Sequence, residues 1–238
     1  VPMTSHLLVL SADVPLIQVE TLEALVSQCK SSQTENIPLA LLLASPTDPT
    51  GLGRIVRDQR KQIISIVEEK DASPEQRQIK EIYSGICCAN AADFQRWLPK
   101  LNSKNAQGEY YLTDIIAMAV ADQVPIVSLQ VNESAEVQGV NNRLQLQQLE
   151  RVLQMRIASQ LMLAGVTLAD AARIDVRGEL ECGKDVFIDV NTIFSGRVAL
   201  GDGCIIGANC SLTNVTLGVN SEILPNSVLD NCHIGDNC

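Results

Sequence analysis

Apolar residues recur at nearly every sixth position through the last third of the chain. The series runs without a break from Val176 to Leu212, and two five-residue steps interrupt it before it reaches Ile234. Neither a helix nor a hairpin has this period, whereas a parallel β-helix places one short strand and one corner in every hexapeptide. Each apolar side chain then points inward, about 4.8 Å from its equivalent in the next coil. The period predicts a parallel β-helix, and a β-sandwich with coincidental spacing is the alternative.

A second inward position follows four residues after the first and carries small or slim side chains. They are Val186, Thr192, Val198, Cys204, Cys210, Thr216, Ser221 and Ser227. Glycine often follows the first apolar residue, at Gly201, Gly207, Gly218 and Gly235. We expect tight corners there, because glycine has permissive backbone dihedrals.

Residues 1–142 alternate short apolar runs with segments of helical character, which favours an α/β domain with a mostly parallel sheet. We expect strands at 6–10, 37–44, 54–56, 63–67, 82–89 and 125–131, and helices at 21–29, 91–101 and 112–121. The polar tip at 57–61 predicts a hairpin between two of these strands.

One long amphipathic helix is predicted at 144–164. Its apolar face consists of Leu146, Leu149, Leu153, Ile157 and Leu161, at three- and four-residue spacing. Gly165 is placed to end the helix. We expect the helix to connect the α/β part to the β-helix and to pack against a domain rather than to form a partner-binding groove.

Charge and composition exclude several classes of function. The net charge is −10 and there is no basic run, which argues against nucleic-acid binding. The longest apolar run, 37–44, is too short to span a membrane, and the N-terminus carries no secretory signal. Most of the eight cysteines fall on inward positions of the repeat or in a β-like run, where free cysteine acts as a small hydrophobe. We expect a reducing, cytoplasmic location.

The strand predicted at 6–10 leads into Ser11, Ala12 and Asp13. In open α/β sheets, ligands bind outside the carboxyl ends of the strands. A carboxylate there can hold Mg²⁺, which usually binds one or two protein oxygens together with substrate phosphate. The alternative is that Asp13 only caps the turn to the next helix.

Three further segments are candidate site elements with equally simple structural explanations. Gly53 and the glycine two residues before it permit close backbone approach to a ligand, although a plain turn has the same pattern. Glu68 ends a strand and can accept hydrogen bonds from a sugar hydroxyl, or can simply be solvated. Asn141 and Asn142 precede the long helix, where asparagine can cap the helix or ligate a metal.

Taken in order, the motifs resemble those of the bacterial bifunctional N-acetylglucosamine-1-phosphate uridyltransferase / glucosamine-1-phosphate acetyltransferase family. They are ADVPLI, DPTGLGRI, IVEEKDA, NAQGEYYLTDII and VQGVNNRLQL. With the long helix and the repeats, the resemblance spans essentially the whole chain. It implies an α/β nucleotidyltransferase-like domain at 1–142, incomplete at its N-terminus, a connecting helix at 143–165, and the start of a left-handed parallel β-helix at 166–238.

The resemblance implies a magnesium site made by Asp13 and Asn141. It also implies that N-acetylglucosamine 1-phosphate attacks the α-phosphorus of UTP, which releases pyrophosphate and forms UDP-N-acetylglucosamine for peptidoglycan and lipopolysaccharide synthesis. The β-helix of the family forms a homotrimer and carries a separate acetyl transfer from acetyl-CoA to glucosamine 1-phosphate. We assign no catalytic residue in this chain.

The resemblance also implies contacts to substrate. Ser11 and Ala12 match the segment that borders the nucleotide sugar, with alanine where glycine is usual. Gly53 and Glu68 match positions that contact the N-acetylglucosamine moiety. Tyr83 stands where the family usually has an asparagine that touches the sugar, and tyrosine supplies no amide.

The family's glycine-rich nucleotide loop and its following lysine do not occur in this sequence, and the acetyl-transfer residues would follow Cys238. We therefore expect a piece of a longer polypeptide that performs neither transfer by itself. Two alternatives stay open. One is a non-catalytic pyrophosphorylase-like subunit for regulation or assembly, and the other is a pyrophosphorylase for another sugar nucleotide.

Overall fold

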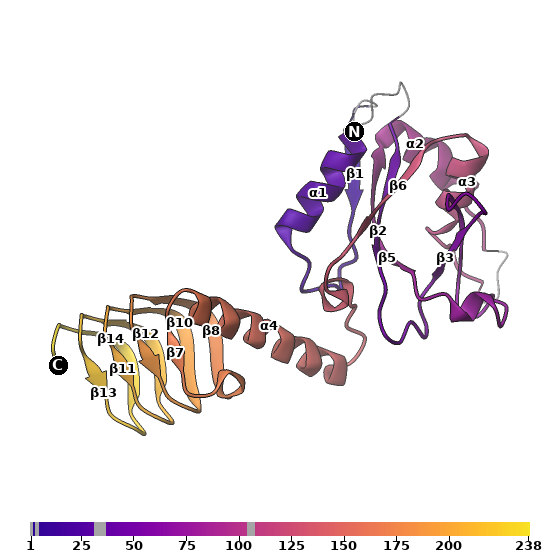
Figure 1. Ribbon diagram of the computed structural model, residues 1–238. Coiled ribbons are helices and arrows are strands. Elements are labelled where there is room, and N and C mark those ends of the chain that lie inside the picture. The colour runs from indigo at the N-terminus through magenta and orange to yellow at the C-terminus, as the bar shows by residue number, and fades with distance from the viewer. Residues whose placement is uncertain (1, 3–4, 31–36, 104–107) are drawn as a thin grey trace. The chain divides into compact units, whose positions relative to one another are not determined.

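The computed structural model describes residues 2, 5–30, 37–103 and 108–238. The chain divides into two compact units, Val1–Asn142 and Arg143–Cys238 (Figure 1). The residues 105–107, which open the NAQGEYYLTDII motif, lie outside the described residues. None of the helices in the described part of the chain is long and apolar enough to cross a membrane.

The first unit contains a six-stranded sheet. Its strands are β1 (His6–Val9), β2 (Leu39–Ala44), β3 (Arg54–Arg57), β4 (Ile63–Val67), β5 (Ile82–Asn90) and β6 (Ile126–Gln130). The order is β4-β3-β5-β2-β6, and β1 also pairs with β5. The hairpin of β3 and β4 is confirmed.

The sheet is mixed rather than mostly parallel, so that part of the prediction is wrong. β2 and β6 pair in parallel, whereas β5 runs antiparallel to β1, β2 and β3. Alternation of strands and helices predicts parallel pairs only when a helical crossover joins the paired strands. Here α1 (Val19–Lys30) joins β1 to β2, which run in the same direction on either side of β5.

Helices cover both faces of this sheet (Figure 1). On one face, Leu25 and Cys29 of α1 pack with Ala40 and Leu42 of β2. On the other face, α2 (Ala91–Trp97) and α3 (Asp114–Ala121) pack on the alternate residues of β2. All six residues of β2 are therefore buried, as the continuous apolar run predicts. Short 3₁₀ turns complete the unit: η1 (Gln76–Gln78), η2 (Leu98–Lys100) and η3 (Ser134–Val137).

The second unit stacks short parallel strands in two four-stranded sheets. One sheet contains β8 (Ile174–Cys182), β10 (Thr192–Leu200), β12 (Ser211–Leu217) and β14 (Val228–Ile234). The other contains β7 (Thr167–Leu168), β9 (Phe187–Ile188), β11 (Ile205–Ile206) and β13 (Glu222–Ile223). Val176 pairs with Phe194, and Phe194 pairs with Leu212. The predicted hexapeptide architecture is confirmed as a β-solenoid, consistent with a left-handed β-helix.

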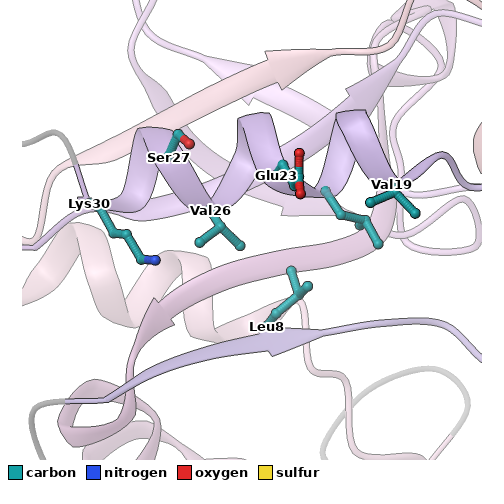
Figure 2. Close-up of a pocket in the computed structure, with 7 residues that line it drawn as sticks. Leu8, Val19, Glu23, Val26, Ser27 and Lys30 are labelled. Atoms are coloured by element: carbon teal, nitrogen blue, oxygen red, sulfur yellow. The ribbon is translucent and has the colours of Figure 1, made fainter.

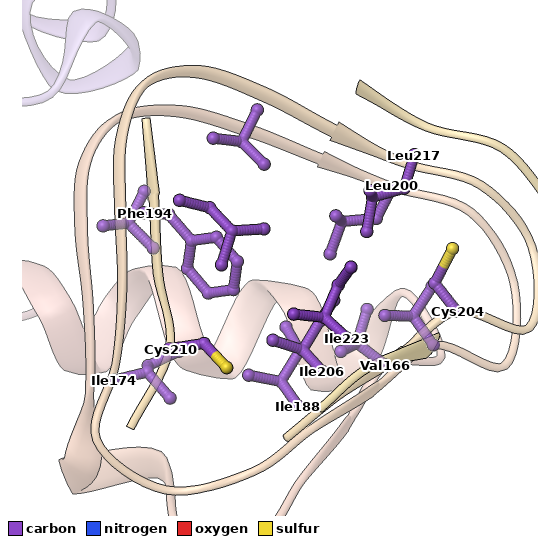
Figure 3. Packing of buried hydrophobic residues seen from close by; sticks show 14 of the residues in the cluster. Val166, Ile174, Ile188, Phe194, Leu200, Cys204, Ile206, Cys210, Leu217 and Ile223 are labelled. Atoms are coloured by element: carbon purple, nitrogen blue, oxygen red, sulfur yellow. The ribbon is translucent and has the colours of Figure 1, made fainter. Parts of the chain in front are cut away.

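The solenoid interior is filled by stacked apolar side chains (Figure 3). One predicted inward residue, Thr216, is exposed, and its neighbour Val215 is buried instead. The register between β10 and β12 shifts between Ser195 and Ala199, so the shorter coil moves the inward position by one residue. The simple spacing rule therefore fails at this five-residue step.

Asparagine, rather than the predicted glycines, supplies many left-handed corners. Asn191 and Asn209 have φ values of 59° and 60°, a conformation that asparagine tolerates better than most residues. The four glycines that follow apolar residues, Gly201, Gly207, Gly218 and Gly235, do not have left-handed φ values. A Cβ on Gly201 would lie 2.8 Å from the carbonyl carbon of Gly218, so glycine is needed there for close approach of the next coil.

Helix α4 (Arg143–Leu163) packs on the first coil. The predicted face is confirmed in part, because Leu149 and Leu161 are buried and Ile157 packs against the solenoid core. Leu146 and Leu153 are exposed, whereas Gln154 and Ala158 are buried. The Gln154 side-chain amide donates to the carbonyl of Val176 and accepts from its N–H, both at 2.8 Å. Gln154 thus satisfies backbone groups at the edge of β8, which an apolar side chain cannot do.

The end of α4 agrees with the prediction. Gly165 has a φ of 102°, and the N–H of Val166 donates to the carbonyl of Leu161. This is a helix end closed by a left-handed glycine. One short turn, η4 (Ala171–Arg173), leads from β7 to β8.

Candidate functional site

The loop before β3 is shaped by local hydrogen bonds. Asp48 accepts from the hydroxyl of Thr50 at 2.6 Å and from its N–H at 3.0 Å. Both bonds lower the pKa of Asp48, and the bond from the Thr50 hydroxyl has the larger effect. Gly51 then adopts a φ of 82°, which favours glycine. The loop consequently turns back and brings Gly53 to the start of β3.

Gly53 lies directly against the end of β4. A Cβ on Gly53 would meet Cγ2 of Ile66 at 2.9 Å and Oε2 of Glu68 at 3.4 Å. Thr113 is the residue before α3, but its hydroxyl makes no capping bond and instead donates to Oε1 of Glu68 at 3.1 Å. The Glu68 carboxylate is therefore held between the glycine loop and the start of α3.

Ser11 approaches from the end of β1. Gly85 in β5 has a φ of 85°, and a Cβ there would lie 2.6 Å from Oγ of Ser11. Two residues earlier, Tyr83 is only 7% exposed. Its hydroxyl has no hydrogen-bond partner of normal geometry among the described residues. Burial, together with the neighbouring Cys87 thiol, raises the pKa of Tyr83, so this phenol stays protonated.

These segments enclose one pocket of about 420 Å³. Four of the predicted site residues line it: Ser11, Gly53, Glu68 and Tyr83. The pocket is also lined by four residues of a candidate motif to which the sequence assigned no role, namely Tyr110, Tyr111, Leu112 and Thr113. The only signal for them was their place in the specific NAQGEYYLTDII motif, to which no role was given. The pocket combines a carboxylate, hydroxyls and aromatic walls, a composition suited to a sugar.

The other three predicted residues, Ala12, Asp13 and Asn141, do not line this pocket. Asp13 and Asn141 belong to adjoining segments, because the N–H of Val140 donates to the carbonyl of Asp13 at 2.9 Å. A Cβ on Gly139 would lie 2.8 Å from Oδ2 of Asp13. Ala12, Asp13 and Asn141 are all exposed.

These residues offer a donor set of the kind that a magnesium site uses. Glycine at position 139 lets the Asp13 carboxylate lie against its backbone, where a Cβ would clash with Oδ2. A carboxylate and an amide oxygen are hard ligands of the type that Mg²⁺ binds, with water and phosphate completing the shell. No group of three or more histidine, cysteine, aspartate or glutamate side chains among the described residues could hold a metal.

A second hollow of about 400 Å³ lies between β1 and α1 (Figure 2). Leu8, Val19 and Val26 give it an apolar lining, and Glu23 and Lys30 stand at its rim. None of the predicted site residues lines it. Apart from these two charged residues, Ser27 is the polar residue of its lining, and we assign the hollow no chemistry.

No family model matches the chain. Curated proteins named "Bifunctional protein GlmU" do match it. Identity is 58% to the protein of Legionella pneumophila subsp. pneumophila (strain Philadelphia 1) and 59% to that of Legionella pneumophila (strain Lens), each over 100% of this chain. It is 49% to the protein of Azoarcus sp. (strain BH72), over 97% of this chain. The family resemblance is thereby confirmed.

The chain spans about half the length of the curated relatives it matches, 52% for the Legionella proteins and 50% for that of Azoarcus. A solved structure, described as a putative glucose-1-phosphate thymidylyltransferase from Bacillus anthracis in complex with a sucrose, is similar to 60% of this chain and 49% of that chain. Its identity is 20% and its TM-score 0.36, which is too low to support an argument.

Proposed function

We propose that this chain forms the sugar-binding side of a uridylyltransferase pocket and the beginning of a hexapeptide-repeat acetyltransferase domain. Residues 1–142, 143–165 and 166–238 would be the uridylyltransferase portion, the connecting helix and the first coils. The complete protein would make UDP-N-acetylglucosamine in two steps, acetyl transfer to glucosamine 1-phosphate and then uridylyl transfer from UTP. The observation that carries this proposal is the pocket in which Ser11, Gly53, Glu68 and Tyr83 meet.

In this proposal the chain's own residues bind and orient the sugar phosphate. Glu68, fixed by the Thr113 hydroxyl, accepts hydrogen bonds from sugar hydroxyls. The backbone at Gly53 approaches the sugar closely because no side chain intervenes. Ser11 and Ala12 border the nucleotide sugar. Orientation of a phosphate oxygen toward the α-phosphorus of UTP converts a bimolecular encounter into a positioned reaction.

Asp13 and Asn141 would hold Mg²⁺, which when bound supplies positive charge to the phosphates. This role is supported by the backbone bond that joins their segments and by the close approach of the Asp13 carboxylate to Gly139. In the complete protein, the β-helix would form a homotrimer and use acetyl-CoA. All eight cysteines are free, which supports a cytoplasmic location.

The test uses the complete protein, UTP, N-acetylglucosamine 1-phosphate and Mg²⁺, with pyrophosphate release as the readout. Asp13→Asn and Asn141→Ala should lower kcat/KM about 100-fold or more and raise the Mg²⁺ concentration needed. Asp58→Asn is the matched control, because Asp58 lies at the tip of the β3–β4 hairpin and does not line the pocket. Wild-type protein that releases no pyrophosphate would contradict the proposal and favour a non-catalytic subunit.

Tyr83 favours one second candidate, a pyrophosphorylase for another sugar nucleotide. Its aromatic ring lines the pocket where the resemblance predicts an amide. Turnover with UTP, dTTP and GTP, each paired with several sugar 1-phosphates, separates the two. Preference for a sugar without an acetamido group, reversed by Tyr83→Asn, would support the second candidate. Preference for N-acetylglucosamine 1-phosphate would reject it.

A further inference from the structure

A buried arginine joins two walls of the pocket without lining the pocket itself. The side chain of Arg54 is only 2% exposed. Its Nη1 donates to the carbonyl of Leu52, and its Nη2 forms an ion pair with Oε2 of Glu69 at 2.5 Å. Its Nε has no acceptor among the described residues. Burying a guanidinium is costly unless it is well paired, so this position calls for an explanation.

The two partners of Arg54 adjoin the residues that face the sugar. Leu52 lies between Gly51 and Gly53, and all three line the pocket. Glu69 directly follows Glu68, the pocket carboxylate. The planar fork of arginine can hold two acceptors at a fixed separation, which the point charge of lysine cannot.

We propose that Arg54 is a positioning residue for sugar binding. It fixes the distance between the glycine loop and the end of β4, and thereby the distance between Gly53 and Glu68. This inference rests on the proposed function, in which both residues contact the sugar. Arg77 supports the same end of β4, because its Nε donates to the carbonyl of Glu69 at 3.3 Å.

The same strand offers a matched control. Arg57 forms a two-pronged pair with Glu81, with Nε–Oε2 at 2.7 Å and Nη2–Oε1 at 2.8 Å. Neither residue lines the pocket. Arg54 and Arg57 therefore lie on the same strand and each pairs with a glutamate, but only the glutamate of Arg54 adjoins the site. Arg57 is also more exposed, 31% against 2%, so a purely structural role predicts different losses of stability but no selective change in the KM for the sugar phosphate.

The experiment measures steady-state kinetics of the complete protein carrying Arg54→Met, Arg54→Lys or Arg57→Met. Arg54→Met should raise the KM for N-acetylglucosamine 1-phosphate about 10- to 100-fold, the scale expected for a small displacement of binding groups. The KM for UTP should change by no more than about twofold. Arg54→Lys should not restore the KM for the sugar phosphate, and Arg57→Met should leave both KM values near wild type.

Folded Arg54→Met protein with an unchanged KM for the sugar phosphate would overturn the inference. The inference would also fail if Arg54→Met and Arg57→Met both changed the KM for the sugar phosphate and the KM for UTP by the same factor. If Arg54→Met does not fold, Glu69→Gln takes its place, because it keeps an acceptor and removes only the charge. An increase of about threefold in the KM for the sugar phosphate supports the inference, and no increase overturns it. If the complete wild-type protein shows no turnover, the proposed function is rejected, and this inference is rejected with it before any variant is compared.

Discussion

In the solenoid, a side chain packs on its own counterpart in the next coil, whereas the pocket of the α/β unit is assembled from distant segments. Asn191 donates to Asn209, 18 residues away, and Asn209 donates to Asn226, 17 residues away. In the α/β unit, by contrast, Thr113 reaches Glu68 across 45 residues. The solenoid can be built from nearest-neighbour contacts, while the pocket requires the whole sheet to be in place.

The largest predicted effect tests the stacking itself. Phe194 is 1% exposed and pairs with Val176 and Leu212 in the coils on either side. Phe194→Ala should lower the free energy of unfolding by about 3–5 kcal/mol, because the cavity cannot collapse between two fixed coils. Urea unfolding followed by circular dichroism measures this loss. Leu224→Ala is the control, since Leu224 is 66% exposed, and should cost about 0.5 kcal/mol or less.

Equal losses in these two variants would show that stacking between coils does not stabilise the solenoid. Binding of sugar phosphate by the α/β unit should be the same in both variants. A loss of that binding in Phe194→Ala alone would contradict the contrast between the two units, because the α/β unit would then depend on the packing of the solenoid.

The contrast also explains what the sequence could reveal. The six-residue period is visible because every coil repeats the same environment, so each inward position reports on the same cavity. The prediction failed where the coil length changed, since Val215 rather than Thr216 points inward after the register shift. The prediction also failed at the corners. Asparagine and glycine both tolerate left-handed dihedrals, and the repeat pattern alone does not show which of the two residue types adopts them at each corner.

For the pocket, the motifs indicated Ser11, Gly53, Glu68 and Tyr83, and the structure brings these four together. The substrate contacts assigned to them, and the magnesium ligands Asp13 and Asn141, stay predictions. The contact between Thr113 and Glu68 could not be predicted, because it depends on how α3 sits against β4. Gln154 was missed for a related reason. Helical periodicity favours leucine at a buried position, but a sheet edge requires hydrogen bonds.

Gln154 provides the second prediction, because this side chain of α4 completes the hydrogen bonds at the edge of β8. Gln154→Leu leaves the buried N–H and carbonyl of Val176 without their partner. Each orphaned group costs about 1–3 kcal/mol, and burial of the leucine side chain offsets part of the sum, so the free energy of unfolding should fall by about 2–4 kcal/mol. Gln148→Leu on the exposed part of α4 is the control. A loss in Gln154→Leu no greater than in the control would mean that the edge of β8 needs no cap.

The third prediction concerns close approach between coils. Gly201→Ala should cost about 1–3 kcal/mol, because its Cβ would lie 2.8 Å from backbone atoms of Gly218 and Val219, which cannot easily move. Gly235 follows an apolar residue in the same way, but in the chain of residues 1–238, on which both variants are measured, a Cβ there would meet no atom within 4 Å. Its cost should stay below about 0.5 kcal/mol. Similar thermal unfolding of the two variants would mean that backbone approach does not explain these glycines.

The smallest predicted effect on stability belongs to the α/β unit, and it is recognised by its dependence on pH. Asp122 accepts from the indole N–H of Trp97 at 2.9 Å and from Nε of Arg96 at 2.8 Å. The hydrogen bond from Trp97 has the largest effect and lowers the pKa of Asp122, and the positive charge of Arg96 lowers it further. A carboxylate with a lowered pKa stabilises the folded state above its ordinary pKa, and this contribution disappears as the pH falls through the lowered value.

Asp122→Asn should therefore melt at a lower temperature than wild type at pH 7, and the difference should shrink as the pH falls below about 4. Trp97→Phe keeps an aromatic ring but removes the indole donor. It should therefore reduce the difference in melting temperature between proteins with aspartate and with asparagine at position 122. Melting followed by circular dichroism measures all four combinations of these residues. A gap that is independent of pH would mean that Asp122 acts through shape rather than charge. The α/β unit would then hold Asp122 against Trp97 by packing, as the interior of the solenoid holds its apolar side chains.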